Sequence, residues 1–177
     1  MVADSIKTPS VLTLVGRRVS GKGTASGRNN RYPGGSIALQ KPLMVERLNA
    51  CDKNELSALL QRCYNGTLNV QIGSDWVVKK SDHTFYNLDW YRGPIGTDPE
   101  KKVITKCETF HLIRCTFSYN GTEHEALIYR LNLAEQGDRP DAQNVIQLIA
   151  EKITLNEKED VFSIKVPAHA ITLKQYE

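Results

Sequence analysis

The sequence FHLIRCTFSYNGTEHEALIYRL, residues 110–131, contains two alternating apolar runs that flank Asn120 and Gly121. Asn-Gly supplies the two positive-φ positions of a tight two-residue turn, so this stretch predicts an antiparallel β-hairpin. Each face of the hairpin carries enough apolar residues to cover a helix. The hairpin therefore indicates an antiparallel sheet as the centre of the fold.

Two other segments have apolar residues at the spacing of an amphipathic helix. In residues 52–66, Asp52 is placed to cap the helix and Glu55 stands at the capping-box position. In residues 137–153, an Asp and a Pro near the beginning are start signals for a second helix. The two apolar stripes are Leu56, Leu59, Leu60 and Cys63, and Val145, Ile146, Ile149 and Ile153.

The other apolar runs are short and alternate with polar residues, which predicts β-strands. These runs are residues 38–50, 67–72, 75–80, 161–166 and 170–176. Gly-Pro and Asp-Pro pairs in residues 81–102 predict a long loop. We therefore expect an α+β fold, a mainly antiparallel sheet with two helices packed on it, in one globular domain of residues 43–177.

The positive charge is concentrated in residues 1–42. This segment carries seven basic residues and the single acid Asp4, a net charge of +6, and leaves −3 for the other residues. Because it is also rich in Gly and Ser, we expect a flexible N-terminal arm that binds a polyanion, such as RNA, a nucleocapsid or an anionic lipid surface. A solvated arm without a partner is the alternative. The expected polyanion-binding residues are Lys7, Arg17, Arg18, Lys22, Arg28, Arg31 and Lys41.

Within this arm, residues 11–15 (VLTLV) are apolar or β-branched, which favours burial in a sheet. We expect them to dock as a strand on the globular domain or on a neighbouring copy of the protein. In the second case they form a self-association site that consists of Val11, Leu12, Leu14 and Val15.

The arm also contains a partial phosphate-loop motif. Gly16, Gly21 and Lys22 fit the spacing G-x-x-x-x-G-K, and Thr24 stands one place beyond the position of the usual Ser or Thr. A phosphate loop must lead directly into a helix, whereas residues 23–36 contain glycines, a proline and adjacent asparagines that oppose a helix. A nucleotide enzyme that uses this loop is therefore only the third of three hypotheses.

Four aromatic residues lie close together in the expected loop of residues 81–102. They form a contact site for a partner or a lipid interface, or they anchor the loop to the core. These residues are Phe85, Tyr86, Trp90 and Tyr91.

The sequence contains no recognisable catalytic or metal-binding constellation. The four histidines are scattered, no serine lies in a G-x-S-x-G motif, and the four cysteines lack C-x-x-C spacing. We therefore expect a protein that is not an enzyme and has no cofactor, metal ion or small-molecule substrate. No apolar run has the length of a membrane-spanning helix, and residues 1–10 lack the order of a signal peptide, so we expect a cytosolic protein.

The order of the elements resembles that of the rhabdovirus matrix proteins. A basic arm and a strand precede the helix with DKNELSALLQRCY, the aromatic loop, the hairpin, the helix with NVIQLIAEKI and the closing strand VFSIKV. The length and the basic amino terminus look like those of the plant-infecting members. Animal members carry a proline-rich late-budding motif such as P-P-x-Y, whereas Pro9, Pro33 and Pro42 stand alone here.

The resemblance implies a structural virion protein that self-associates and bridges the nucleocapsid and the inner face of the membrane. It implies a location in the virion, the host cytoplasm and the peripheral membrane, and it leaves nuclear entry open. The alternative is a small RNA-virus coat protein or an RNA-binding module, in which the arm meets RNA and the strands form a jelly roll. The presence of two well-patterned helices favours the matrix protein over the coat protein.

Overall fold

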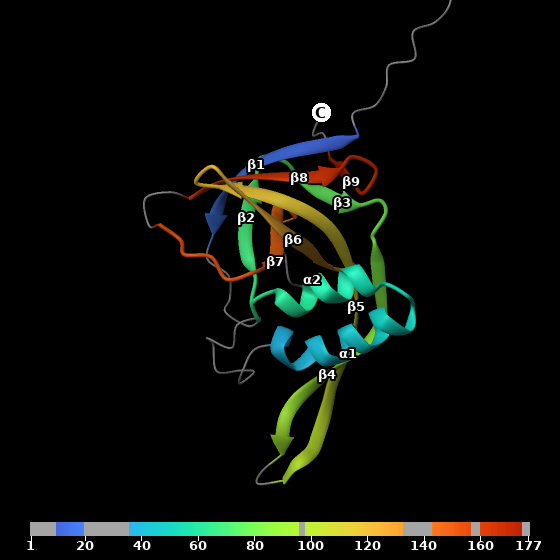
Figure 1. Ribbon diagram of the computed structural model, residues 1–177. Coiled ribbons are helices and arrows are strands. Elements are labelled where there is room, and N and C mark those ends of the chain that lie inside the picture. The colour runs from blue at the N-terminus through green and yellow to red at the C-terminus, as the bar shows by residue number, and fades with distance from the viewer. Residues whose placement is uncertain (1–9, 20–35, 96–97, 133–142, 157–159, 175–177) are drawn as a thin grey trace, which may run out of the picture.

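The structure, a computed structural model, describes residues 10–19, 36–95, 98–132, 143–156 and 160–174 (Figure 1). The helices are α1 (Ser36–Ala50) and α2 (Asn54–Arg62). The strands are β1 (Val11–Val19), β2 (Leu68–Ile72), β3 (Trp76–Val78), β4 (His83–Ile95), β5 (Asp98–Tyr119), β6 (Thr122–Leu131), β7 (Val145–Ala150), β8 (Val161–Pro167) and β9 (Ile171–Leu173).

Six of the strands form a closed antiparallel barrel. The seven-stranded sheet has the order β4-β5-β6-β7-β2-β1-β8, and β5 also pairs with β8, which joins the two sides. The closing ladder runs from Thr116 opposite Lys165 to Ser118 opposite Ser163. β4 lies outside the barrel and continues with the first half of β5 as a long projecting ribbon (Figure 1). β3 and β9 pair separately as a small second sheet.

The hydrophobic core has two parts, one inside the barrel and one between its outer wall and the helices. Along β5, Ile113, Cys115 and Phe117 belong to the interior, whereas Phe110 and Leu112 pack with α1 and α2. The interior also contains Leu14, Val70, Ile128, Ile146, Leu148, Phe162, Ile164 and Val166. Both faces of the hairpin are therefore buried for part of its length, one inside the barrel and the other under the helices.

The expected α+β fold is wrong, because the protein is β-rich and its sheet closes into a barrel. Residues 137–153, expected as a helix, contain β7 instead. Ile146, Leu148 and Ala150 recur with the period of a strand and point into the barrel, while Ile149 packs against the helices on the outer side. A short run that is buried on both faces has apolar residues at every spacing, so helix and strand cannot be separated by periodicity.

Residues 38–50, expected as a strand, belong to helix α1. Its buried residues recur at helical spacing, at Ile37, Met44 and Leu48, with Gln40 also fully covered. Pro42 lies inside the helix, so the expected boundary between arm and domain at residue 42 falls within α1. A helix interior is an unfavourable place for proline, and tertiary packing overrides that local preference here.

The hairpin of residues 110–131 and the helix in residues 52–66 are confirmed. Asn120 and Gly121 have φ values of 51° and 73°, as a two-residue turn of type I′ requires. The helix begins one residue later than expected, because the N-cap is Lys53 and not Asp52. Lys53 makes no side-chain hydrogen bond that caps the helix. The predicted capping role of Asp52 is therefore wrong; it has a left-handed backbone, with φ of 56°.

The expected loop of residues 81–102 is wrong as well, because most of it lies in β4 and β5. The ladder between these strands has four register shifts, beginning between Phe85 and Leu88. Pro94 and Pro99 are tolerated there because only two strands pair in this region, and proline can occupy the free edge of a strand. Within the described parts of the chain, no helix is long and apolar enough to cross a membrane.

Candidate interaction surface

The outer face of β1 and β8 carries three exposed valines. Val11, Val15 and Val161 have exposed fractions of 49%, 62% and 50%. The register places Val15 opposite Ser163 and Val161 opposite Arg17, so all three valines lie on one side of the same strand pair. Between them lie the hydroxyl side chains of Thr13 and Ser163 and the charged side chain of Lys165, which is opposite Thr13. We call this set, Val11, Thr13, Val15, Val161 and Ser163, the outer valine face.

Two ion pairs involve residues that lie opposite members of the outer valine face. Arg17 Nη1 lies 3.2 Å from Asp160 Oδ1, and Lys165 Nζ lies 2.6 Å from Glu123 Oε2. All four side chains are at least 38% exposed, so each pair is hydrated and contributes little to the stability of the fold. Lys165 lies opposite Thr13, between Val11 and Val15, and Arg17 lies opposite Val161, so apolar and charged side chains are interspersed on this surface.

The four residues expected to mediate self-association are divided by strand alternation. Leu14 is buried inside the barrel, and Leu12 packs against the same interior cluster. Val11 and Val15 point to the other side and are exposed. β8 pairs with Val11–Arg17 of β1, and β2 pairs with Gly16–Val19 on the other edge, so Val11–Val15 have a described ladder partner on the β8 edge only. Val11 and Val15 therefore offer an exposed outer face to another copy.

The expected polyanion-binding residues are separated in the same way. Lys7, Lys22, Arg28 and Arg31 lie outside the described residues. Arg17 and Arg18 belong to β1, where the Arg17 side chain is 72% exposed.

Lys41 has a structural contact in α1. Its ammonium donates a hydrogen bond of 2.5 Å to the carbonyl oxygen of Cys63, the C-cap residue of α2. Burial lowers the pKa of Lys41. A cation at the C-terminal end of a helix stabilises the last carbonyls, so Lys41 joins α1 to α2.

The expected aromatic contact site is also divided. Phe85 is 1% exposed and stacks on Phe110 with ring centroids 4.9 Å apart, so it belongs to the core under the helices. Tyr86, next to it, is 70% exposed. Trp90 and Tyr91 lie further along β4, in the projecting ribbon.

Gly16, the first glycine of the partial phosphate-loop motif, lies within β1 and pairs with Ile72 of β2 and Phe162 of β8. A Cβ atom at this position would lie 2.7 Å from Val70 Cγ1 and would overlap the Gln71 carbonyl oxygen. The glycine thus permits close approach of β1 and β2. Gly21, Lys22 and Thr24, the rest of the motif, lie outside the described residues.

Groups suited to catalysis are held in structural contacts. The Thr84 hydroxyl lies 2.9 Å from His111 Nδ1 and 2.8 Å from the Ser81 hydroxyl, which links β4 to β5. Burial lowers the pKa of His111, so its neutral form is favoured. Burial also raises the pKa of Cys63 to about 11, which keeps its thiol protonated. Among the described residues, no group of three or more potential ligands is placed to hold a metal ion.

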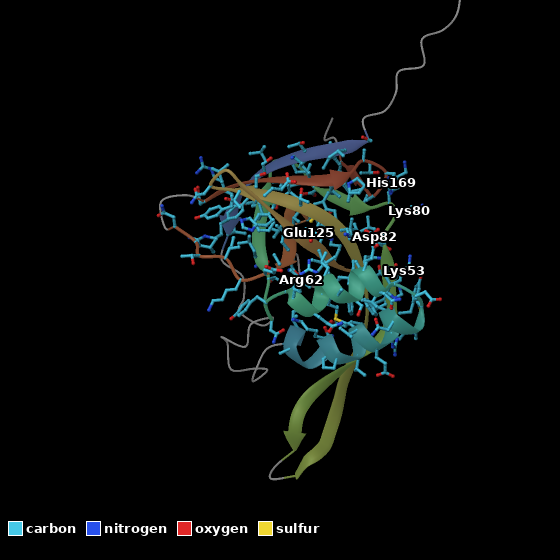
Figure 2. All side chains as sticks on the ribbon, in the orientation of Figure 1. Lys53, Arg62, Lys80, Asp82, Glu125 and His169 are labelled. Atoms are coloured by element: carbon cyan, nitrogen blue, oxygen red, sulfur yellow. The ribbon has the colours of Figure 1, made fainter. Side chains whose placement is uncertain are left out.

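An ion-pair network that sequence patterns did not predict connects α2 to the barrel wall. Arg62, in the last turn of α2, bonds to Glu125 of β6 at 2.9 Å and to Glu151 beyond β7 at 3.0 Å. Arg114 of β5 bonds to Glu55 of α2 at 3.0 Å and to Glu125 at 3.5 Å. Figure 2 shows Arg62 and Glu125 where the end of α2 meets the barrel. These charges come from four elements, so only the tertiary structure brings them together.

Val161 and Ser163, the two residues that β8 contributes to the outer valine face, were missed by the sequence prediction. The alternation in β8 contains the signal, because Phe162, Ile164 and Val166 are buried while Val161 and Lys165 are exposed. No protein-family model and no curated protein sequence matches this chain. The candidate surfaces are therefore interpreted from their own chemistry.

Proposed function

We propose that this protein is a non-enzymatic virion protein of the matrix type, which self-associates and bridges a nucleocapsid and the inner face of a membrane. The observation that carries the proposal is the outer valine face. Exposed apolar side chains that lie together on a sheet face favour a protein contact, whereas single exposed apolar residues do not. Their occupant is a second copy of the chain.

The composition of this surface supports self-association. Interfaces between subunits combine apolar contacts with hydrogen-bonded polar groups, and the valines and the two ion pairs among them provide both. A surface with charges of both signs is also compatible with a symmetric contact, in which Arg17 of one copy approaches an acid of the other. Because the exposed valines project from the outer face of the β1 and β8 pair, copies meet face to face through that surface.

The polyanion contact in this proposal rests on the charge distribution. Residues 1–42 carry a net charge of +6 in a chain whose total is +3. The exposed Arg17 pair is weak enough for a phosphate to replace Asp160 as the partner of the guanidinium. Binding to RNA or anionic lipid should therefore weaken as salt increases.

The alternative function is an RNA-binding module or a coat protein. The barrel closes six strands, whereas a jelly roll contains eight strands in two sheets, so the architecture differs from the one expected of a coat protein. The earlier preference for a matrix protein relied on a helix in residues 137–153, and β7 removes that reason. The exposed valines now carry the preference for an assembly protein.

Sedimentation velocity over a concentration series tests the proposal. The wild type should form oligomers as concentration rises, and a variant with Val11→Thr, Val15→Thr and Val161→Thr should remain smaller, because threonine keeps the β-branched shape and adds a polar group. Tyr64→Ser is the matched control, since Tyr64 is 49% exposed but lies outside the face. A wild type that stays monomeric at every concentration would contradict the proposal.

A flotation assay with phosphatidylserine vesicles completes the test. The wild type should float with the vesicles at low salt and dissociate from them as the salt concentration increases. Hydrolysis of a nucleoside triphosphate by the purified protein would instead support the nucleotide enzyme.

A further inference from the structure

Three exposed lysines carry charges that no carboxylate among the described residues neutralises. The cations that do form ion pairs are Arg17, Arg62, Arg114 and Lys165. Lys53, Lys79 and Lys80 are exposed, and no carboxylate of a described residue lies within ion-pair distance of their ammonium groups. We call these three residues the lysine row. Its positive charge is therefore available to a ligand.

The lysine row lies along one side of the molecule. Lys79 and Lys80 follow β3, and their backbone N–H groups both donate to one carbonyl oxygen in the turn before β9, at 2.8 and 3.0 Å. β4 begins three residues later at His83, and Lys53 is close enough to His83 to act on it electrostatically. Figure 2 shows Lys80, Asp82 and Lys53 one after another along this side. Two separate segments thus place their lysines together.

The acids near the lysine row do not pair with it. Asp82 Oδ2 accepts a hydrogen bond of 2.6 Å from the backbone N–H of Arg114 in β5. Glu55, in the first turn of α2, bonds to the Arg114 guanidinium at 3.0 Å. Asp52 precedes Lys53 in the chain, is exposed and forms no ion pair with a described residue. The excess of positive charge therefore persists in the folded protein.

The charge of Lys53 opposes the structure around it. His83 is half-buried, and its ring lies 4.5 Å from the ring of Phe85 in an edge-to-face contact. Burial lowers the pKa of His83, and the charge of Lys53 lowers it further. Lys53 also stands at the N-cap of α2, where the helix dipole is positive. A residue that conflicts with its local structure is expected at a functional site.

We propose that the lysine row binds the phosphates of single-stranded RNA, an inference that rests on the polyanion contact in the proposed function. Unpaired ammonium groups that follow one another suit a backbone that repeats its negative charge along a line. Contacts to phosphates position a nucleic acid and carry no sequence information, so we expect binding without sequence preference. None of the three lysines belongs to the outer valine face, so the two contacts can be varied separately.

The surroundings of the lysine row favour RNA over a membrane. Binding to a lipid surface depends on buried apolar area in addition to positive charge. None of the exposed large apolar side chains among the described residues lies in residues 52–54 or 79–84. An anionic bilayer would also bring lipid phosphates against Asp82, whereas one RNA strand passes beside it.

Fluorescence anisotropy with a labelled single-stranded RNA of about 20 nucleotides, measured over a salt series, tests the inference. In the full chain, Lys79→Gln with Lys80→Gln should reduce the slope of log K against log salt by about 1.4, or about 0.7 for each lost phosphate contact. Lys53→Gln should reduce the slope by about 0.7. Lys152→Gln with Lys174→Gln is the matched control, because it removes two charges from exposed lysines outside the row and should leave the slope unchanged.

The pKa of His83 provides a second measurement, which does not depend on the variants of Lys79 and Lys80. A phosphate beside Lys53 offsets the repulsion between the ammonium and the imidazolium, so RNA should raise the pKa of His83. NMR of the histidine ring protons measures this change, and His83→Gln identifies the resonance. Lys53→Gln should raise the pKa of His83 without RNA. RNA bound at a distant surface would leave it unchanged.

An unchanged salt slope in both lysine-row variants would overturn the inference, as would a wild type that binds no RNA or an unchanged pKa of His83 in the complex. Loss of vesicle flotation in the lysine-row variants, with RNA binding intact, would assign the row to the membrane instead. The failure of the proposed function is seen separately, in the sedimentation of the valine variant. An oligomeric wild type that floats with vesicles and ignores RNA would retain the proposed function and reject the RNA site.

Discussion

Gly16 of β1 lies so close to Gln71 of β2 that a Cβ atom would overlap the Gln71 carbonyl oxygen. This approach occurs where β1 pairs with β2 and β8 at the same residue, since Gly16 lies opposite both Ile72 and Phe162. The overlapping atom belongs to the backbone, so it cannot move aside as a flexible side chain can. The absence of a side chain at Gly16 thus permits this close approach of β1 and β2.

Gly16→Ala should destabilise the protein by about 1–3 kcal/mol, the usual range for an inserted methyl group in a packed site. Urea unfolding followed by circular dichroism measures the change. Gly73→Ala is the matched control, because a Cβ at Gly73 has no heavy atom within 4 Å, and it should change stability by less than about 0.5 kcal/mol. Equal stability of Gly16→Ala and the wild type would contradict this role of Gly16.

Leu14→Ala and Val15→Ala should have very different effects although the residues are neighbours. Leu14 is 5% exposed inside the barrel, so its truncation should cost about 2–5 kcal/mol. Val15 is 62% exposed, and its truncation should change the stability of the monomer by less than about 0.5 kcal/mol. Thermal unfolding at low protein concentration compares the two. Similar losses would show that Val15 is covered within the monomer.

Lys41→Met should destabilise the contact between the helices. The substitution keeps the aliphatic stem but removes the ammonium that bonds to the Cys63 carbonyl oxygen. The expected loss is about 1–2 kcal/mol, from one charge-assisted hydrogen bond at a helix C-terminus. Lys53→Met is the control, because Lys53 is exposed at the N-cap of α2, where a cation is unfavourable. That variant should be as stable as the wild type or slightly more stable in urea unfolding.

Stability should fall as pH rises from about 9 to about 11. Burial raises the pKa of Cys63 from 9.0 to about 11, so in this window the unfolded chain loses a proton that the folded chain keeps. The unfolded state then binds fewer protons, and the free energy of unfolding decreases with pH, by about 2 kcal/mol from this group. Urea unfolding of the wild type and Cys63→Ala at each pH isolates the effect. Parallel curves for the two proteins would contradict the assignment.

Local sequence was sufficient for two elements. Asn120 and Gly121 form a two-residue turn because both readily adopt the positive φ angles that this turn requires. In α2 the buried residues lie on one side of the helix and the polar residues on the other, a pattern that fits a helix and not a strand. Only the β1 part of the outer valine face could be predicted from the sequence, because the alternation in residues 11–15 places Leu14 and Val15 on opposite faces of the strand.

The sequence by itself determined the hairpin, helix α2, the alternation of β1 and the concentration of positive charge in residues 1–42. Only the tertiary structure decided that β7 is a strand, that α1 is a helix and that the sheet closes between β5 and β8. The physical reason is that local preferences act over a few residues, whereas these outcomes depend on burial between distant segments. When a segment is buried on both faces, the spacing of its apolar residues does not distinguish a helix from a strand. Pairing with the neighbouring strands of the barrel then determines that the segment is a strand.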